Sequence, residues 1–331
     1  MLEISSRHAR AWSRIGPRAI YGQALHALAT ANPNIIALSA DLGRSSGLDR
    51  FSKELPDQFV NVGIAEQNMV GCAAGLARMG FDVFASTFAP FASMRASEQV
   101  RMNMGYMRES VKLVALGSGL SMAYLGNSHF GLEDVAVMRT IPGLTIIAPA
   151  DCAELQKVLA DCVGYDQPVY IRLTGAMNAP VVYTEDYSFE IGRAVRLTPL
   201  REVMLISSGT TVGHCLNAIE MLAQEGIEVG LLNMHTIKPL DTFALGDIAD
   251  CARAIFVVEE HTTVGGLGSA VLDHYNDCGR LCSSIFLHGI ADRFVETGDY
   301  DFMLKKNRLD APGIASFVRE RLGGGGDQDE R

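Results

Sequence analysis

A single carboxyl group and two aromatic rings are the residues in this sequence whose types and spacing suggest chemistry. Glu66 directly follows a Gly-Ile-Ala turn and opens a helical stretch of small apolar residues, and Phe88 and Phe91 follow the next strand. A carboxyl group at a buried helix start, together with an aromatic shelf, would form a pocket for a flat heterocycle. Both features also have ordinary explanations, because acids stabilise the first turn of a helix and two rings at this spacing are typical of a protein core.

Apolar strands and helices alternate on both sides of these residues. The pattern predicts strands at 34–39, 59–62, 81–86, 111–117, 143–148 and 168–173, and helices at 19–31, 65–79, 89–105, 131–140 and 151–165. Continuous apolar strands between helices indicate a parallel sheet covered on both faces, whose ligands bind outside the carboxyl ends of the strands. The loop 41–46, Phe88 and the loop 117–129 all follow such ends, so the sequence places the pocket there.

A second alternating unit follows the first. It has predicted strands at 203–207, 227–232, 254–258 and 284–287 and predicted helices at 211–225, 241–252, 264–277 and 311–322. We therefore predict an α/β protein with two doubly wound domains, the first built on a parallel sheet. The predicted boundaries are a loose lead-in at 1–16, the first domain at 17–175, a linker at 176–192, the second domain at 193–322 and a disordered tail at 323–331.

The composition excludes several classes of protein. The 331 residues carry a net charge of −10 without a Lys- or Arg-rich run, which argues against nucleic acid or an anionic membrane as the main partner. The sequence contains no run of about 18 apolar residues, the length needed to span a membrane. The polar N-terminus does not resemble a signal peptide. The seven cysteines are scattered and lack C-x-x-C pairs, so we expect no disulfide framework, no metal site in this chain and a reducing cytoplasm as its location.

Several motifs agree in order and spacing with one enzyme family. The run Gly-Ile-Ala-Glu-Gln-Asn at 63–68, followed by Ser-Thr-Phe-Ala-Pro-Phe at 86–91 and Glu-Gln-Val-Arg at 98–101, resembles the pyrimidine-binding domain of transketolases. Residues 233–241 and 257–268 resemble the transketolase C-terminal domain, and the resemblance covers roughly residues 15–322. Transketolases use thiamine diphosphate, so the resemblance implies this cofactor.

The resemblance also implies a missing half. Full-length transketolases begin with a domain that binds the cofactor diphosphate and Mg²⁺ through a Gly-Asp-Gly…Asn motif, and no Gly-Asp-Gly occurs in this sequence. The chain is therefore identified as a C-terminal subunit of a split transketolase. We expect an N-terminal transketolase-type subunit with that motif as its partner, holding most of the Mg²⁺ site, in an α2β2 heterotetramer.

The family assigns Glu66 and the rings to the cofactor. It implies that Glu66 hydrogen-bonds the pyrimidine ring nitrogen and promotes loss of the thiazolium C2 proton. For this role Glu66 has to hold a proton, which burial beside Phe88 and Phe91 would favour. Met94 stands where the family has a stacking Tyr, and Ile64 is expected to line the same pocket.

Three further positions match substrate-binding positions of the family. His129 occupies the position of a His near the substrate carbonyl, and Arg18 and Ser45 match positions that contact the sugar phosphate. A lone His, a surface Arg and a turn Ser are more often structural, so these roles depend on the resemblance.

Three departures predict altered substrate recognition. A family Asp that accepts the donor hydroxyl is Leu125 here, and a buried Leu would leave that hydroxyl unpaired. A family His falls on Gly117 and a family Arg falls on Gly175, with Arg172 nearby as a remaining substrate-binding candidate. Buried polar contacts carry this kind of discrimination, so we expect an unusual ketose, a deoxy sugar or a 2-oxo acid as donor or acceptor.

The implied function is transfer of a two-carbon ketol unit to an aldehyde acceptor, with activity only in the presence of the partner subunit. One alternative is the β subunit of a 2-oxo acid dehydrogenase E1 component, which uses the same cofactor and a similarly divided chain. Another is a non-catalytic regulatory subunit, against which the intact Glu66, Phe88 and His129 argue. The Gly-Ile-Ala-Glu-Gln run is closer to transketolase than to the dehydrogenases.

Overall fold

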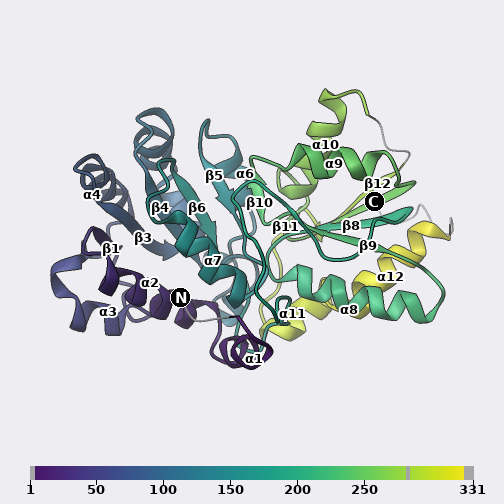
Figure 1. Ribbon diagram of the computed structural model, residues 1–331, viewed down its shortest axis with the longest axis horizontal. Helices are drawn as coiled ribbons and strands as arrows, with labels where there is room; N and C mark the ends of the chain where they lie inside the picture. The colour runs from purple at the N-terminus through teal and green to yellow at the C-terminus, as the bar shows by residue number, and fades with distance from the viewer. Residues whose placement is uncertain (1–3, 281–283, 324–331) are drawn as a thin grey trace.

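The computed structural model describes residues 4–280 and 284–323, which form two α/β domains side by side (Figure 1). The predicted disordered tail lies outside the described residues except for Gly323. In the first domain the strand order is β10-β5-β6-β4-β3-β1-β2, and all neighbours are parallel except β10, which is antiparallel to β5. These strands are β1 (Ile35–Ser39), β2 (Phe59–Asn61), β3 (Asp82–Phe88), β4 (Val111–Leu116), β5 (Thr145–Ile147), β6 (Val169–Arg172) and β10 (Thr236–Lys238).

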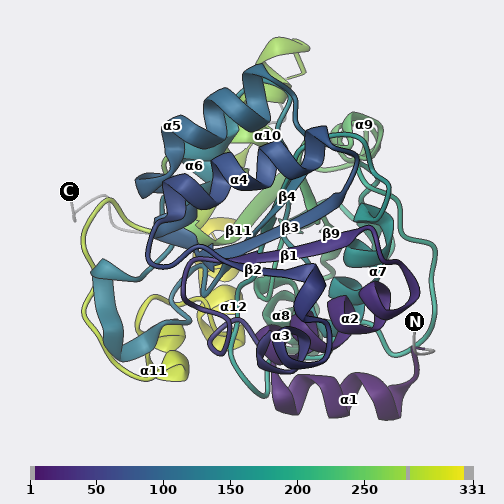
Figure 2. The same cartoon turned by 90° about the vertical axis from the view of Figure 1, so that its left-hand side faces the viewer.

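Helices cover both faces of this sheet, as the apolar strands predict. On one face lie α2 (Pro17–Ala31), α3 (Asp49–Glu54) and α7 (Cys152–Cys162), and on the other lie α4 (Glu66–Arg78) and α6 (Asp134–Arg139) (Figure 2). The predicted helix 89–105 is interrupted. It consists of π-helical turns at Phe91–Arg95 and Val100–Tyr106 on either side of α5 (Ser97–Gln99). Such π-turns widen a helix locally and are frequent at functional sites.

The second domain has the strand order β12-β11-β8-β9-β7, parallel except for β7 against β9. Its strands are β7 (Val195–Arg196), β8 (Val203–Ser207), β9 (Gly230–Asn233), β11 (Ala254–Thr262) and β12 (Ile285–Ile290). The helices α8 (Thr211–Gln224) and α12 (Ala311–Leu322) cover one face, and α9 (Thr242–Ala249) and α10 (Leu267–Asp277) cover the other (Figure 1). The predicted fold class, two doubly wound α/β domains, is confirmed. The strand β10 follows β9 in the chain but joins the first sheet, so the two domains share a strand.

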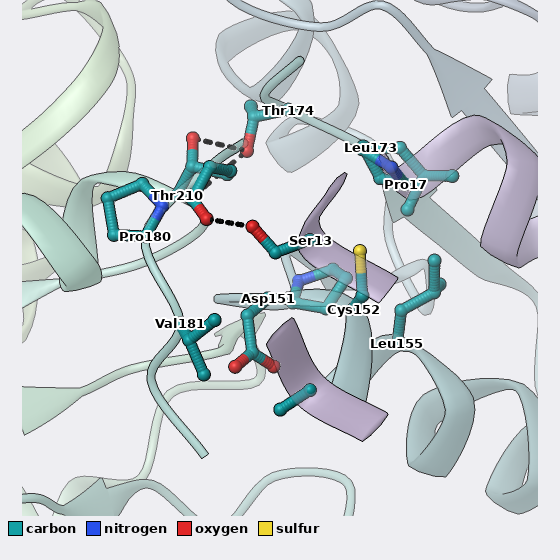
Figure 3. Close-up of a pocket in the computed structure, with 13 residues that line it drawn as sticks. Ser13, Pro17, Asp151, Cys152, Leu155, Leu173, Thr174, Pro180, Val181 and Thr210 are labelled. Carbon is teal, nitrogen blue, oxygen red and sulfur yellow. Dashed lines mark hydrogen bonds between the residues drawn. The ribbon is translucent and has the colours of Figure 1, made fainter. Parts of the chain in front are cut away.

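The predicted loose lead-in at 1–16 is wrong, because Ser6–Ile15 forms the helix α1. Ser5 caps this helix by accepting a hydrogen bond from the His8 N–H. Trp12 is buried, and Ser13 donates a hydrogen bond to the Ala179 carbonyl in the segment between the domains (Figure 3). The polar composition hid this helix, since only one narrow face of it is apolar. Within the described part of the chain, no helix is both long enough and apolar enough to cross a membrane.

Candidate active site

Glu66 is positioned by the ends of two parallel strands. Asn61 ends β2, and its Oδ1 accepts hydrogen bonds from the N–H groups of Asp41, after β1, and Gly63. Gly63 has a φ of +76°, which only glycine adopts readily, and it turns the chain into α4. Glu66 is the first residue of α4 and is 3% exposed. Its Oε1 accepts a hydrogen bond from Arg95 Nη1 at 2.7 Å.

The two predicted rings and His129 pack against one another. The centroid of the His129 ring lies 5.9 Å from that of Phe88 and 5.4 Å from that of Phe91, and the two phenyl rings are 6.0 Å apart. The Arg95 guanidinium lies over the Phe91 ring, 4.1 Å from its centroid. Glu66, Phe88, Phe91, Arg95 and His129 therefore form one contiguous group, called here the Glu66–His129 cluster.

Arg95 is the member of this cluster that the sequence prediction missed. A signal was available, because Arg95 follows Phe91 by four residues, and residues four apart share one face of a helix. Cations are attracted to the faces of aromatic rings, so this spacing predicts the observed stacking. The ion pair with Glu66 could not be predicted, because α4 and the segment 91–95 meet only in the tertiary structure.

His129 lies in the loop between β4 and α6. Its Nδ1 is 2.9 Å from the hydroxyl of Ser128. Two backbone hydrogen bonds close the base of the loop, from Gly119 N to Gly131 O at 2.8 Å and from Gly131 N to Gly119 O at 3.2 Å. The loop is thus closed at its base, and it brings His129 against Phe88 at the end of the adjacent strand β3 and against Phe91 in the segment that follows.

Three predicted site residues lie at the surface beside the cluster. Ile64 is 78% exposed, Met94 is 50% exposed and Leu125 is 53% exposed. The expectation of a buried Leu125 is therefore wrong for this chain by itself, because the loop turns that side chain outward. Ile64 precedes Glu66 by two residues and Met94 follows Phe91 by three, so these two exposed side chains come from the same segments as members of the cluster.

Arg18 and Ser45 lie on neighbouring segments that pack closely. A Cβ added to Gly47 would meet the Arg18 carbonyl oxygen at 2.4 Å, so the loop after β1 rests directly on the first turn of α2. Both predicted side chains are exposed. Their substrate role stays a prediction, because it depends on a ligand that would reach from the Glu66–His129 cluster to this part of the surface.

Gly117 and Gly175, which stand where the family has a His and an Arg, both have backbone conformations and neighbours that favour glycine. Gly117 has a φ of +64°, and a Cβ there would lie 2.4 Å from Met122 Sδ, so Met122 fills the space next to Phe88. Gly175 has a φ of +87°, and a Cβ there would lie 2.5 Å from Thr210 Cγ2 at the junction of the domains. With this backbone a His or Arg side chain would be strained and crowded at either position.

Arg172 is not a free side chain in the candidate pocket. It is 3% exposed, and its Nε donates to both carboxylate oxygens of Asp134 at 3.0 Å. Its Nη2 donates to the carbonyl oxygens of Gly131 and Glu260, both at 2.9 Å. This geometry favours a positioning role beneath the His129 loop over the substrate contact that the sequence predicted.

A buried group of charges also lies in the second domain, on the strand β11. Burial raises the pKa of Glu259 to about 7, although the N–H groups of Gly268 and Leu267 at the start of α10 act in the opposite direction. Burial lowers the pKa of the adjacent His261 to about 4. The sequence shows two consecutive acids, Glu259 and Glu260, at the end of an apolar strand, but it does not show which groups hydrogen-bond to them.

The pKa of Glu259 predicts a pH dependence of stability. A carboxyl group whose pKa is raised on folding contributes stability below its unfolded pKa of 4.5, and this stability is lost as the pH rises through about 7. Relative to Glu259→Gln, we expect the free energy of unfolding of the wild type to fall by on the order of 2–3 kcal/mol from about pH 5 to about pH 8. Urea unfolding at both pH values measures this difference.

The control for this prediction is Glu320→Gln. Arg308 lowers the pKa of Glu320, so Glu320 titrates below the tested pH range. The difference in free energy of unfolding between Glu320→Gln and the wild type should therefore stay constant from about pH 5 to about pH 8. Burial lowers the pKa of His261, so its titration acts in the opposite direction in both proteins. Parallel pH profiles of these two proteins would contradict the prediction.

The two parallel-sheet domains and the carboxyl–aromatic cluster at the strand ends together define a transketolase-type pair of domains. Family models match accordingly: the transketolase pyrimidine-binding domain over residues 14–177 and the transketolase C-terminal domain over residues 192–314. The chain belongs to the transketolase family and corresponds to its C-terminal half.

Similar proteins agree with this assignment. The chain is 38% identical to a putative transketolase C-terminal section from Methanocaldococcus jannaschii, over 93% of this chain and 96% of that protein. It is 35% identical to one of the subunits of an apulose-4-phosphate transketolase from Phocaeicola vulgatus, over 92% of this chain and 97% of that protein. It is also similar to a solved split-gene transketolase, an inactive β4 tetramer, with a TM-score of 0.84, 36% identity, and coverage of 93% and 99% of the two chains.

Proposed function

We propose that this chain is the C-terminal subunit of a heteromeric, thiamine diphosphate-dependent transketolase-like enzyme. The enzyme transfers a two-carbon ketol unit from a ketose-type donor to an aldehyde acceptor. The observation that carries the proposal is the Glu66–His129 cluster, which combines a buried carboxyl group, two packed rings and an imidazole at the strand ends of a transketolase-type sheet. A regulatory subunit with a decayed pocket would not require this combination.

The residues present fit the aminopyrimidine end of the cofactor. The Arg95 guanidinium is planar, stacks on Phe91 and donates an N–H to Glu66. A planar nitrogen heterocycle that hydrogen-bonds the same carboxyl group would make the same two kinds of contact. We infer that Glu66, Phe88 and Phe91 hold the pyrimidine ring, with Met94 and Ile64 at its edge, and that Arg95 moves aside.

The metal end of the cofactor has no counterpart in the described part of the chain. Residues 4–280 and 284–323 contain no group of three or more His, Cys, Asp or Glu side chains that could hold a metal ion. The proposal therefore assigns Mg²⁺ and the diphosphate to an N-terminal transketolase-type subunit, in an α2β2 assembly. One relative is described as a C-terminal section and another as a transketolase subunit, which supports a divided enzyme.

Glu66, His129 and the two rings have different tasks in the proposed reaction. The bound cofactor supplies the electron sink for breaking and forming the carbon–carbon bond. Glu66 holds a proton at the pyrimidine ring nitrogen. His129 donates a hydrogen bond to the substrate carbonyl oxygen, where negative charge develops in the transition state. The packed rings exclude water from the space between them.

The proposed substrate lacks at least one feature of an ordinary transketolase donor. Leu125 offers no acceptor to a donor hydroxyl and Gly175 offers no guanidinium to a phosphate, while Arg18 and Ser45 remain for a weaker anion site. The names of two relatives refer to apulose 4-phosphate and to 6-deoxy-6-sulfo-D-fructose, which supports specialised donors in this group. A donor hydroxyl that the assembled site buries without a hydrogen-bond partner costs about 1–3 kcal/mol.

Donor competition tests the function and the substrate class together. The reconstituted enzyme is given xylulose 5-phosphate, an unphosphorylated ketose or a 2-oxo acid with an aldehyde acceptor, and kcat/KM is compared. We expect xylulose 5-phosphate to be disfavoured roughly ten- to several hundredfold against the best alternative. A hundredfold preference for xylulose 5-phosphate would show ordinary specificity. Decarboxylation of the 2-oxo acid without ketol transfer would favour the dehydrogenase alternative.

A further inference from the structure

The loop that carries His129 is held at its base by the second domain. Leu120, just after β4, donates its backbone N–H to Glu260 Oε1 at 2.6 Å. Glu260 lies on β11 of the second domain and is 2% exposed. A Cβ added to Gly119 would lie 2.2 Å from Glu260 Oε1, so the loop approaches this carboxyl group as closely as its backbone allows.

Glu260 is itself fixed by the second domain. Its Oε2 accepts hydrogen bonds from the hydroxyls of Tyr300 at 2.7 Å and Thr210 at 3.2 Å. Thr210 also bonds Thr174, which follows β6 of the first domain (Figure 3). Because both of its oxygens are engaged by donors on different elements, Glu260 is a rigid support and not a mobile side chain.

A second contact holds the far side of the same loop. Asn127 Nδ2 donates to the Val295 carbonyl at 2.8 Å, and the Val295 N–H donates back to Asn127 Oδ1 at 3.2 Å. Next to this pair, a Cβ added to Gly126 would lie 2.5 Å from Thr297 Cγ2. The segment 295–297 follows β12, so this contact also comes from the second domain. His129 stands two residues beyond the paired Asn127.

We propose that the second domain sets the position of His129, through Glu260 at the base of its loop and Asn127 at its tip. This inference rests on the proposed function, in which His129 contacts the substrate carbonyl. Neither residue touches the reacting atoms, so both are positioning residues. Glu66 lies on the other side of the cluster, on α4, and is not part of these contacts.

The test is Asn127→Ala in the reconstituted enzyme, because this side chain is exposed and its loss leaves the core intact. We expect kcat of ketol transfer to fall roughly ten- to a hundredfold, as for a misplaced catalytic group. The dissociation constant of thiamine diphosphate and the C2 proton exchange of the bound cofactor should stay at wild-type values, since Glu66 is unaffected. Amide hydrogen exchange should become faster in residues 117–131.

Two further variants make the result specific. Gly126→Ala pushes the loop away from Thr297 and should lower kcat in the same way. Asn307→Ala removes a similar amide-to-carbonyl hydrogen bond, to Met303 within α11 (Tyr300–Lys306), and should change neither kcat nor loop exchange. Wild-type kcat in both loop variants, with an active wild-type enzyme, would overturn the inference. An inactive wild-type assembly would instead contradict the proposed function.

Discussion

Replacing Glu66 by Gln in the assembled enzyme is expected to slow C2 proton exchange of bound thiamine diphosphate by roughly a hundredfold to ten-thousandfold. Gln can neither hold nor release the proton at the pyrimidine ring nitrogen, although it has nearly the same shape as Glu. The Glu66 carboxyl accepts a hydrogen bond from Arg95, and Gln can still accept it through its carbonyl oxygen. The fold should therefore persist, and NMR of the C2 proton measures the rate.

The matched control for this variant is Glu109→Gln. Glu109 is also a largely buried carboxylate, 9% exposed, that pairs with a partly exposed arginine, Arg78, at 2.8 Å. It lies in the same domain but outside the Glu66–His129 cluster. Replacing Glu109 should remove a similar ion pair without slowing C2 proton exchange of the bound cofactor. An exchange rate near wild type in Glu66→Gln would mean that Glu66 serves only to stabilise the first turn of α4.

Activity is expected to be absent from the isolated chain and to appear only when the N-terminal subunit is added. In the proposed function this chain supplies the pyrimidine site and the partner subunit holds Mg²⁺ and the diphosphate, so we expect the affinity of the isolated chain for thiamine diphosphate with Mg²⁺ to be weak. Calorimetry of the chain alone and of the mixture measures the difference. Strong Mg²⁺-dependent binding by the chain alone would contradict the divided site.

The outward face of α4 provides a variant that separates assembly from folding. Gly71 and Gly75 are exposed on this helix, and a Cβ at either would meet nothing within 4 Å. The sequence predicts that this nearly uncharged helix is buried in the chain or against a partner, and the structure leaves one face open. We expect this face to contact the partner subunit, so Gly71→Leu should fold normally yet weaken assembly roughly tenfold to a hundredfold by overpacking that contact.

Gly246→Leu, on α9 of the second domain, is the control for assembly. A Cβ at Gly246 has its nearest neighbour, Arg280 Nη1, at 3.8 Å, an ordinary van der Waals contact, so we expect this chain to fold with the substitution. Sedimentation of each variant with the partner subunit reports the affinity. Normal assembly of Gly71→Leu would mean that the α4 face stays in solvent and that the partner binds elsewhere.

Local patterns in the sequence were sufficient for the order of strands and helices. Buried parallel strands are continuous apolar runs, and functional residues of such sheets follow the strand ends, so Phe88 and the loop 117–129 could be placed near one edge of the sheet, whereas Glu66 and His129 were assigned roles through the resemblance to transketolases. The helix α1 was missed because one narrow apolar face within a polar sequence gives a weak signal.

Only the tertiary structure decided which groups hydrogen-bond to the buried acids. Arg95 and Glu66 are 29 residues apart, and Leu120 and Glu260 are 140 residues apart. No local pattern specifies such pairs, because they depend on how elements pack after folding. The same reason explains why Arg172, expected at the substrate, is instead buried against Asp134, and why β10 joins the first sheet although its neighbours in the chain belong to the second domain.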